Sequence, residues 1–152
     1  YKKKIIGFDT FEGFPSVSEI DNSKIGMFAE NYNTYEELLE CIDEYNENRF
    51  LNNLDKIELV KGDANVTIPE YIKNNEHLLV SLLYLDFDIY EPTKMALKHI
   101  MPRMSKGSII AFDELHAENW KGETMAMLES LNIRDCKIEN FSFEPNISFI
   151  QL

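Results

Sequence analysis

Short apolar runs alternate with amphipathic stretches along the chain, and this alternation predicts an α/β fold. Four runs have the length of a strand and are apolar almost throughout, which is typical of parallel strands covered on both faces. They span residues 4–9, 57–60, 78–85 and 108–112. Two further runs, at residues 137–143 and 147–152, are separated by a Glu-Pro-Asn segment and predict an antiparallel hairpin.

Helices are predicted between these strands. Asn33 or Thr34 can cap a helix in which apolar side chains recur at helical spacing as far as Tyr45. Alternating strands and helices imply right-handed crossovers and a mostly parallel sheet with helices on both faces. Ligands of such sheets bind beyond the carboxyl ends of the strands. The other helices are expected at residues 69–74, from 91 or 92 to 100, and at 122–131, and one domain covers residues 1–152.

Acidic residues stand where four of the apolar runs stop. An acid at one such position is most often a helix cap or a solvated turn residue, but acids after four strands of one sheet favour a shared site. Hard divalent cations such as magnesium prefer carboxylate oxygens, and without a cation the mutual repulsion of such acids would raise the pKa of at least one. The acids are Asp9, Asp63, Asp86 with Asp88, and Asp113 with Glu114.

These acids suggest two kinds of binding. Asp86, Asp113 and Glu114 form the natural metal triplet. Asp9, after the first strand, is placed to accept both hydroxyls of a ribose, as a nucleoside cofactor requires. Asp63 is placed to accept from an amine such as that of adenine.

Composition excludes several partners. The 27 acidic and 15 basic residues give a net charge of -12, which argues against binding along a phosphate backbone. Cys41 and Cys136 form no metal-binding spacing, and two ordinary thiols favour a reducing, cytoplasmic setting. No apolar run approaches the roughly 20 residues needed to cross a bilayer, so neither nucleic acid nor membrane is expected as a partner.

Three segments together resemble the macrocin O-methyltransferase (TylF) family of S-adenosylmethionine-dependent enzymes. They are Phe-Asp-Thr-Phe-Glu-Gly-Phe-Pro at residues 8–15, Leu-Asp-Phe-Asp-Ile-Tyr-Glu at 85–91 and Phe-Asp-Glu at 112–114. The resemblance implies a Rossmann-like class I methyltransferase sheet. It also implies an O-methyltransferase that acts on sugar hydroxyls of natural products or glycans, with a divalent metal held by strand-end acids.

The resemblance extends the expected site. Cofactor-binding residues are then Asp9, Phe11, Asp63 and Ala64, with S-adenosyl-L-methionine as the cofactor and Mg²⁺ or a similar cation on Asp86, Asp113 and Glu114. The expected substrate is a small-molecule sugar or sugar nucleotide, and a homo-oligomer stays open. His116 and Asp86 are the catalytic candidates, since a histidine just past the metal motif can accept a proton near neutral pH. Trp120, Phe11 and Phe14 either cover the sugar or adenine ring or pack against the loop.

The chain departs from the family in one respect. Methyltransferases of this class carry a first strand that ends in a glycine-rich loop around the methionine part of the cofactor, and the six glycines of this chain are too dispersed to form it. We therefore expect that an amino-terminal portion is missing. The central strand of a 3-2-1-4-5-7-6 sheet would be missing with it, so cofactor binding by these residues alone is in question.

Three other readings compete. Residues 109–116 resemble the DExH motif of ATPases, but no GxxxxGK[ST] phosphate loop is present. Asp86-Phe87-Asp88 also fits the DxD motif of metal-dependent glycosyltransferases, although basic residues for a diphosphate lie only on or beyond the next helix. The third interpretation is a non-catalytic, degenerate methyltransferase-like domain. The free-energy cost of clustering carboxylates without an ion argues against it.

Overall fold

The computed structural model describes residues 3–29 and 32–152 as an α/β fold. The first elements along the chain are β1 (Ile5–Asp9), α1 (Thr34–Asn48), β2 (Ile57–Lys61) and α2 (Ala64–Asn74). They are followed by β3 (Val80–Leu85), α3 (Tyr90–Ile100), β4 (Met104–Phe112), α4 (Lys121–Ser130), β5 (Ile138–Phe141) and β6 (Glu144–Gln151). Two single-turn 3-10 helices, Met101–Arg103 and Ile133–Asp135, complete the described elements.

The strands form two groups. β1 and β2 pair in parallel, from Ile5 opposite Ile57 to Asp9 opposite Lys61. The second group has the order β3-β4-β6-β5, in which β3 and β4 are parallel and β6 runs antiparallel to both of its neighbours. The predicted mixture of parallel strands with a terminal antiparallel hairpin is thus confirmed. Within the described residues, however, no ladder joins β1 to β3, so one continuous sheet is not formed.

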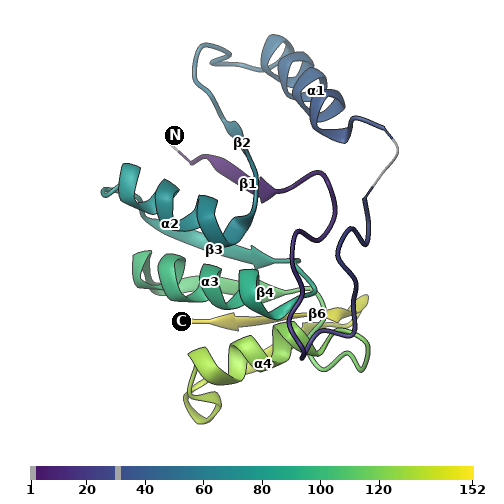
Figure 1. Ribbon diagram of the computed structural model, residues 1–152. Coiled ribbons are helices and arrows are strands. Elements are labelled where there is room, and N and C mark those ends of the chain that lie inside the picture. Colours follow the sequence, from purple (N-terminus) through teal and green to yellow (C-terminus); the bar gives the residue numbers. More distant parts are fainter. Residues whose placement is uncertain (1–2, 30–31) are drawn as a thin grey trace.

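One face of the larger sheet carries the hydrophobic core. α2, α3 and α4 lie side by side over it (Figure 1), α3 packing against both of the others. Fully buried side chains come from both layers and include Ile68 of α2, Leu97 of α3, Leu85 of β3 and Phe112 of β4. This packing fixes the carboxyl ends of β3 and β4 relative to the helices that follow them.

The opposite face of β3 is exposed. Leu82 is 59% exposed and Tyr84 is 46% exposed, while Leu83 and Leu85, which alternate with them along the strand, are buried. The prediction that helices cover both faces of this strand is therefore wrong for the described residues. The acidic helix α1 has no buried residue and stands apart from the other helices (Figure 1).

Two predicted boundaries shift for identifiable reasons. α2 begins at Ala64, five residues before the proline expected to open it, because the Asp63 side chain accepts the Asn65 N–H (2.9 Å) and caps the helix there. β4 begins at Met104, four residues before the expected start at 108, because Met104 pairs with Val80 before the register shifts ahead of the pair Leu82–Ile109.

No helix in residues 3–29 and 32–152 combines the length and apolar character needed to span a membrane. Cys41 and Cys136 are both free thiols.

Candidate functional site

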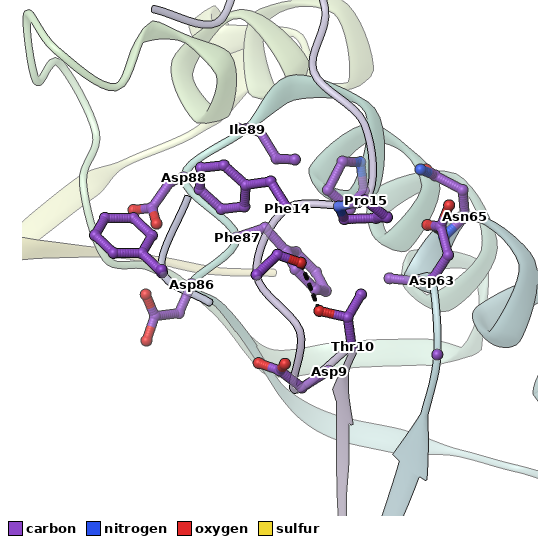
Figure 2. A pocket seen from close by; sticks show the side chains of 15 residues that line it. Asp9, Thr10, Phe14, Pro15, Asp63, Asn65, Asp86, Phe87, Asp88 and Ile89 are labelled. Atoms are coloured by element: carbon purple, nitrogen blue, oxygen red, sulfur yellow. Dashed lines mark hydrogen bonds between the residues drawn. The ribbon is translucent and has the colours of Figure 1, made fainter. Parts of the chain in front are cut away.

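A cavity of about 160 Å³ lies beyond the carboxyl ends of β1, β2 and β3. This is the edge of the sheet at which the sequence predicts ligand binding. Its walls come from the loop after β1, the β2–α2 turn and the β3–α3 turn (Figure 2). The lining residues are Thr10, Gly13, Phe14, Pro15 and Phe28; Gly62, Asp63, Ala64 and Asn65; and Asp86, Phe87, Asp88, Ile89 and Pro92, with Asp9 at the end of β1.

Asp9 is fixed by its own loop. Its Oδ1 accepts the N–H of Phe11 at 2.5 Å, and its carbonyl accepts the N–H of Gly62 at 2.9 Å. The first contact orients the carboxylate, and the second joins the ends of β1 and β2. Phe11, with a φ of 57°, does not line the cavity, and its ring instead packs against Tyr35 with the centroids 5.0 Å apart.

Asp63 and Ala64 line the cavity at the start of α2. The Asp63 carboxylate caps α2. A helix cap is the role that an acid after a strand most often has. Ala64 is buried directly beside it. Figure 2 shows Asp63 and Asn65 on the side of the cavity opposite Asp86 and Asp88.

The acids that follow β3 and β4 lie close together. Leu85 pairs with Phe112, and the N–H of Asp113 donates to the Leu85 carbonyl at 3.0 Å, so the two strands deliver their acids side by side. Burial, then repulsion from Asp113 and Asp9, raises the pKa of Asp86. Burial and the nearby Asp113 and Asp86 carboxylates raise the pKa of Glu114 in the same way. The carboxylates of Asp86, Asp113 and Glu114 are therefore near enough for the pKa of Asp86 and of Glu114 to be raised by their neighbours.

Asp88 belongs to the same group. Burial, followed by repulsion from Asp86, Glu114 and Asp113, raises its pKa to about 6. Its backbone has a φ of 60°, a conformation that costs a non-glycine residue free energy and tends to occur at functional sites. Unlike Glu114, it lines the cavity (Figure 2).

The chemistry of these acids suits a hard cation, but their arrangement does not form a ligand set. Within residues 3–29 and 32–152, no three Asp, Glu, His or Cys side chains are placed to hold one ion. The Asp113 Oδ1 instead accepts a short hydrogen bond from the Tyr84 hydroxyl. Glu114 keeps one buried carboxylate oxygen, Oε2, without a hydrogen-bond partner. In this arrangement Asp86, Asp113 and Glu114 do not jointly form a site for one ion.

His116 lies away from the cavity. It is exposed, adopts a φ of 67°, and donates its backbone N–H to the Thr124 Oγ1 at 2.8 Å. The structure thus brings Asp9, Asp63, Ala64 and Asp86 to the cavity wall, while Phe11, Asp113, Glu114 and His116 stand behind or beside it.

Glu123, in the first turn of α4, is a residue that sequence reasoning missed. Its side chain is fully buried, and its Oε2 accepts the Glu114 N–H at 3.0 Å. Burial raises the pKa of Glu123 to about 8; the hydrogen bond from Glu114 opposes this rise, and the carboxylates of Asp88, Asp113 and Asp86 add to it. Its only sequence signal is an acid that follows Gly122 in a segment with weak helical periodicity.

The loop after β1 is folded onto the site. Gly13 has a φ of 75°, and a Cβ at that position would lie 2.4 Å from the Met27 carbonyl oxygen. Asp21 anchors the loop to α3, since its buried carboxylate accepts the Tyr90 N–H at 2.8 Å. Phe14, Phe28 and Trp120 pack together, with ring centroids 5.4–6.3 Å apart. The aromatic residues therefore pack against one another, and Phe14 and Phe28 also reach the cavity.

Comparisons with known proteins agree with this geometry. The family model described as macrocin-O-methyltransferase (TylF) matches residues 1–135. A comparison with curated protein sequences gave no match.

Solved structures of similar fold include two of CalS11. The calicheamicin methyltransferase structure has a TM-score of 0.91 and 35% identity, over 97% of this chain and 60% of that one. The apo structure, described as a TDP-rhamnose 3'-O-methyltransferase, has a TM-score of 0.80 and 33% identity, over 97% of this chain and 58% of that one. The O-methyltransferase NovP shares the fold, with a TM-score of 0.65 and 17% identity over 99% of this chain and 60% of its own. The chain thus spans about three fifths of the length of these proteins.

Proposed function

Because the chain belongs to the macrocin-O-methyltransferase (TylF) family, we propose that the protein transfers a methyl group from S-adenosyl-L-methionine to a sugar hydroxyl. The observation that carries the proposal is the cavity at the strand ends, walled by Asp9 on one side and by Asp86 and Asp88 on another. The substrate class follows the description of CalS11 as a TDP-rhamnose 3'-O-methyltransferase. A small-molecule sugar or sugar nucleotide is accordingly the proposed acceptor.

Asp9 is the proposed partner of the cofactor ribose. A carboxylate at the end of a strand accepts both ribose hydroxyls, and the hydrogen bond from the Phe11 N–H holds this one in place. Phe11 thus serves the cofactor through Asp9. Asp63 uses one oxygen to cap α2, which leaves the second for an amine of the adenine, beside the small Ala64.

Two groups are proposed as acceptors of the proton that leaves the sugar hydroxyl. His116 has the side chain suited to this role near neutral pH, but it lies outside the cavity wall. Asp88 lines the cavity next to Asp86, and a general base must come within hydrogen-bond reach of its proton. Position therefore favours Asp88 over His116.

A magnesium ion is proposed on Asp86, Asp113 and Glu114. The support is chemical: carboxylate oxygens from adjacent strands raise one another's pKa, and a cation would remove that repulsion. When bound, the ion would lower the pKa of a sugar hydroxyl and orient it. Two free cysteines support a proposed cytoplasmic setting.

We also propose that a further amino-terminal segment completes the domain. Its support is the unpaired edge between β1 and β3 and the exposed Leu82 and Tyr84 on the uncovered face of β3. A strand in that gap would join the two groups of strands into one sheet, and a helix after it would cover the apolar face. The methionine part of the cofactor would then be bound by that segment.

The test is a methyl-transfer assay on the full-length protein with labelled S-adenosylmethionine and a panel of nucleotide sugars that includes TDP-rhamnose. Transfer is expected with magnesium and is expected to stop on addition of a chelator. Replacing Asp86 or Asp113 by Asn should lower kcat at least about 100-fold, while Asp55→Asn, an exposed change remote from the site, should leave it unchanged.

Each other outcome has a distinct meaning. Transfer that is indifferent to chelator would remove the metal from the proposal. Glycosyl transfer from a nucleotide sugar with manganese would favour the DxD reading of residues 86–88. A protein that binds S-adenosylmethionine without turnover on any acceptor would be a non-catalytic member of the family.

A further inference from the structure

The first turn of α4 holds the segment that carries Asp113 and Glu114. Glu123 Oε2 accepts the Glu114 N–H at 3.0 Å, and Thr124 Oγ1 accepts the His116 N–H at 2.8 Å. Two successive side chains of one helix thus bind alternate amides of the segment. Both amides belong to residues of one turn, in which the Ala117 N–H donates to the Glu114 carbonyl at 3.3 Å.

The segment has few other restraints. The ladder between β4 and β6 ends at Phe112, opposite Ser148, and the N–H of Asp113 makes the last bond to a strand, at the Leu85 carbonyl. In the described structure, the next backbone bonds are weak turns at 3.3 Å, formed by the amides of Ala117 and Trp120. Within the described residues, the Glu114 and His116 amides therefore donate to side chains of α4 and to no backbone carbonyl.

The same helical turn also contacts the loop after β1. A Cβ on Gly122 would lie 2.3 Å from the Asp21 Oδ1 and 2.4 Å from the Tyr90 backbone nitrogen. Asp21 in turn accepts the Tyr90 N–H and both the backbone N–H and the hydroxyl of Ser18. The first turn of α4 is thus in contact with the segment after β4, with the loop after β1 and with the start of α3.

A purely structural contact would not need a carboxylate at position 123. Glu123 is fully buried, its Oε1 has no hydrogen-bond partner, and its neighbours include Asp86, Asp88 and Asp113. Burying an incompletely bonded acid among other acids costs free energy. An apolar side chain of similar volume would avoid that cost but would leave the Glu114 N–H without its acceptor. The carboxyl group at position 123 is therefore set against the hydrogen bond that it provides to the Glu114 amide.

We propose that Glu123 is a positioning residue: it sets the place of Glu114, and with it the acid pair at the end of β4, while Thr124 sets the place of His116. The inference rests on the proposed function for its catalytic consequence. The structural part of the proposal is that two side chains of α4 hold the Glu114 and His116 amides, and this part does not depend on the reaction.

The first experiment measures amide hydrogen exchange in the full-length protein. Glu123→Met removes the acceptor and fills the same space, whereas Glu123→Gln keeps an accepting oxygen. The Glu114 amide should exchange at least about 10-fold faster in Glu123→Met than in wild type, and Glu123→Gln should restore protection. Thr124→Val and Thr124→Ser form the matching pair for the His116 amide. Equal protection of Glu114 in both position-123 variants would overturn the proposal, whether or not the protein transfers methyl groups.

The second experiment separates positioning from stability in the methyl-transfer assay. Glu123→Met should lower kcat about 10- to 100-fold, because small displacements of reacting groups have effects of this size. Its KM for S-adenosylmethionine should stay within error of wild type. Its Tm should change little, because removal of the buried carboxyl group offsets the loss of the hydrogen bond to the Glu114 amide. Glu123→Gln should recover most of kcat, and Met125→Ala, at an exposed position of the same helix, should match wild type.

The outcomes distinguish this proposal from the proposed function. Wild-type kcat in Glu123→Met would overturn the catalytic part. If kcat and Tm both fall in Glu123→Met and Glu123→Gln recovers neither, Glu123 has a structural role only. Absence of any transfer by the wild type would count against the proposed function, and the exchange measurement would still decide whether Glu123 and Thr124 hold the segment.

Discussion

Gly122 is a residue whose lack of a side chain is required by its neighbours. A Cβ there would approach the backbone of Tyr90 and of Ile89, at 2.4 Å and 2.7 Å, as well as the Asp21 carboxylate. Backbone cannot yield as a flexible side chain can, so α3 and α4 would have to separate. The position is helical, and helix propensity alone would favour alanine over glycine by about 1 kcal/mol.

We therefore predict that Gly122→Ala lowers the free energy of unfolding by about 1–3 kcal/mol, the usual cost of overpacking. Urea unfolding of the full-length protein measures the change. Met125→Ala, at an exposed position of the same helix, is the matched control and should be close to neutral. A stabilised Gly122→Ala variant would mean that the contact between α4 and Asp21 is looser than described.

Asp63 allows the capping role to be tested by itself. Its Oδ1 accepts the Asn65 N–H at 2.9 Å, and loss of such a cap costs about 1 kcal/mol. Asp63→Ala should therefore lower the free energy of unfolding by about that amount, while Asp63→Asn, which keeps a capping oxygen, should not. Denaturant midpoints compare the two, and equal losses in both variants would show that the charge matters more than the cap.

The site could be predicted from sequence where chemistry follows strand order. Asp9, Asp63 and Asp86 were found because an acid directly after an apolar run must lie at the strand end, and all three line the cavity. Glu123 could not be found in this way. Its burial depends on how α4 packs against the segment after β4, and nothing local in the sequence distinguishes it from Glu129, the exposed acid of the same helix.

At the scale of elements, a side-chain network joins β1, β2 and α2. The Glu58 carboxylate of β2 accepts hydrogen bonds from the Tyr71 hydroxyl at 2.8 Å and from Lys4. Partial burial alone would raise the pKa of Glu58, but the hydrogen bonds from Lys4 and Tyr71, with the charge of Lys4, lower it below its ordinary value of 4.5. The pKa of Tyr71 is raised to about 12, so its hydroxyl remains a donor at any pH of interest.

This network predicts an acid-sensitive contribution to stability. Because the folded-state pKa of Glu58 is depressed, its contribution is present above about pH 4.5 and is lost as the pH falls through the folded value. Glu58→Gln should be less stable than wild type at pH 7, and the difference should narrow as the pH approaches 3. Urea midpoints across that range give the result, and a difference independent of pH would contradict the assignment.

Element types were predictable from periodicity, while their boundaries depended on contacts. The strand at residues 108–112 was expected to start after Ser105-Lys106-Gly107, a segment with turn-like composition. In the fold, β4 begins at Met104 because Val80 of β3 pairs with it. The register then shifts, so that the next pair is Leu82 with Ile109. Such pairing is a property of two strands together and is not visible in either alone.

At the scale of the molecule, the cavity draws its residues from both groups of strands. β1 and β2 contribute Asp9 and Asp63, the larger sheet contributes the remaining acids, and the residues that line the cavity come from both groups of strands. The dispersed glycines, and the separation of β1 from β3 among the described residues, support the proposal of a further segment. Such a segment would also cover Leu82 and Tyr84, which are exposed on an otherwise apolar strand.

The proposed completion predicts how cofactor affects stability. In the full-length protein, S-adenosylmethionine at about 100 times its Kd should stabilise the fold by about 2.7 kcal/mol, a rise of roughly 5–10 °C in Tm. Asp9→Asn keeps an oxygen for the Phe11 N–H but loses the charge that accepts the ribose hydroxyls, so at the same ligand concentration its rise should be much smaller. Asp55→Asn, an exposed change remote from the cavity, should retain the full rise.

Residues 1–152 alone should show little shift in Tm, because the segment proposed to bind the methionine part of the cofactor is not among them. A full shift with Asp9→Asn would remove Asp9 from the cofactor site, and a full shift with residues 1–152 alone would show that no additional strand is needed to bind it.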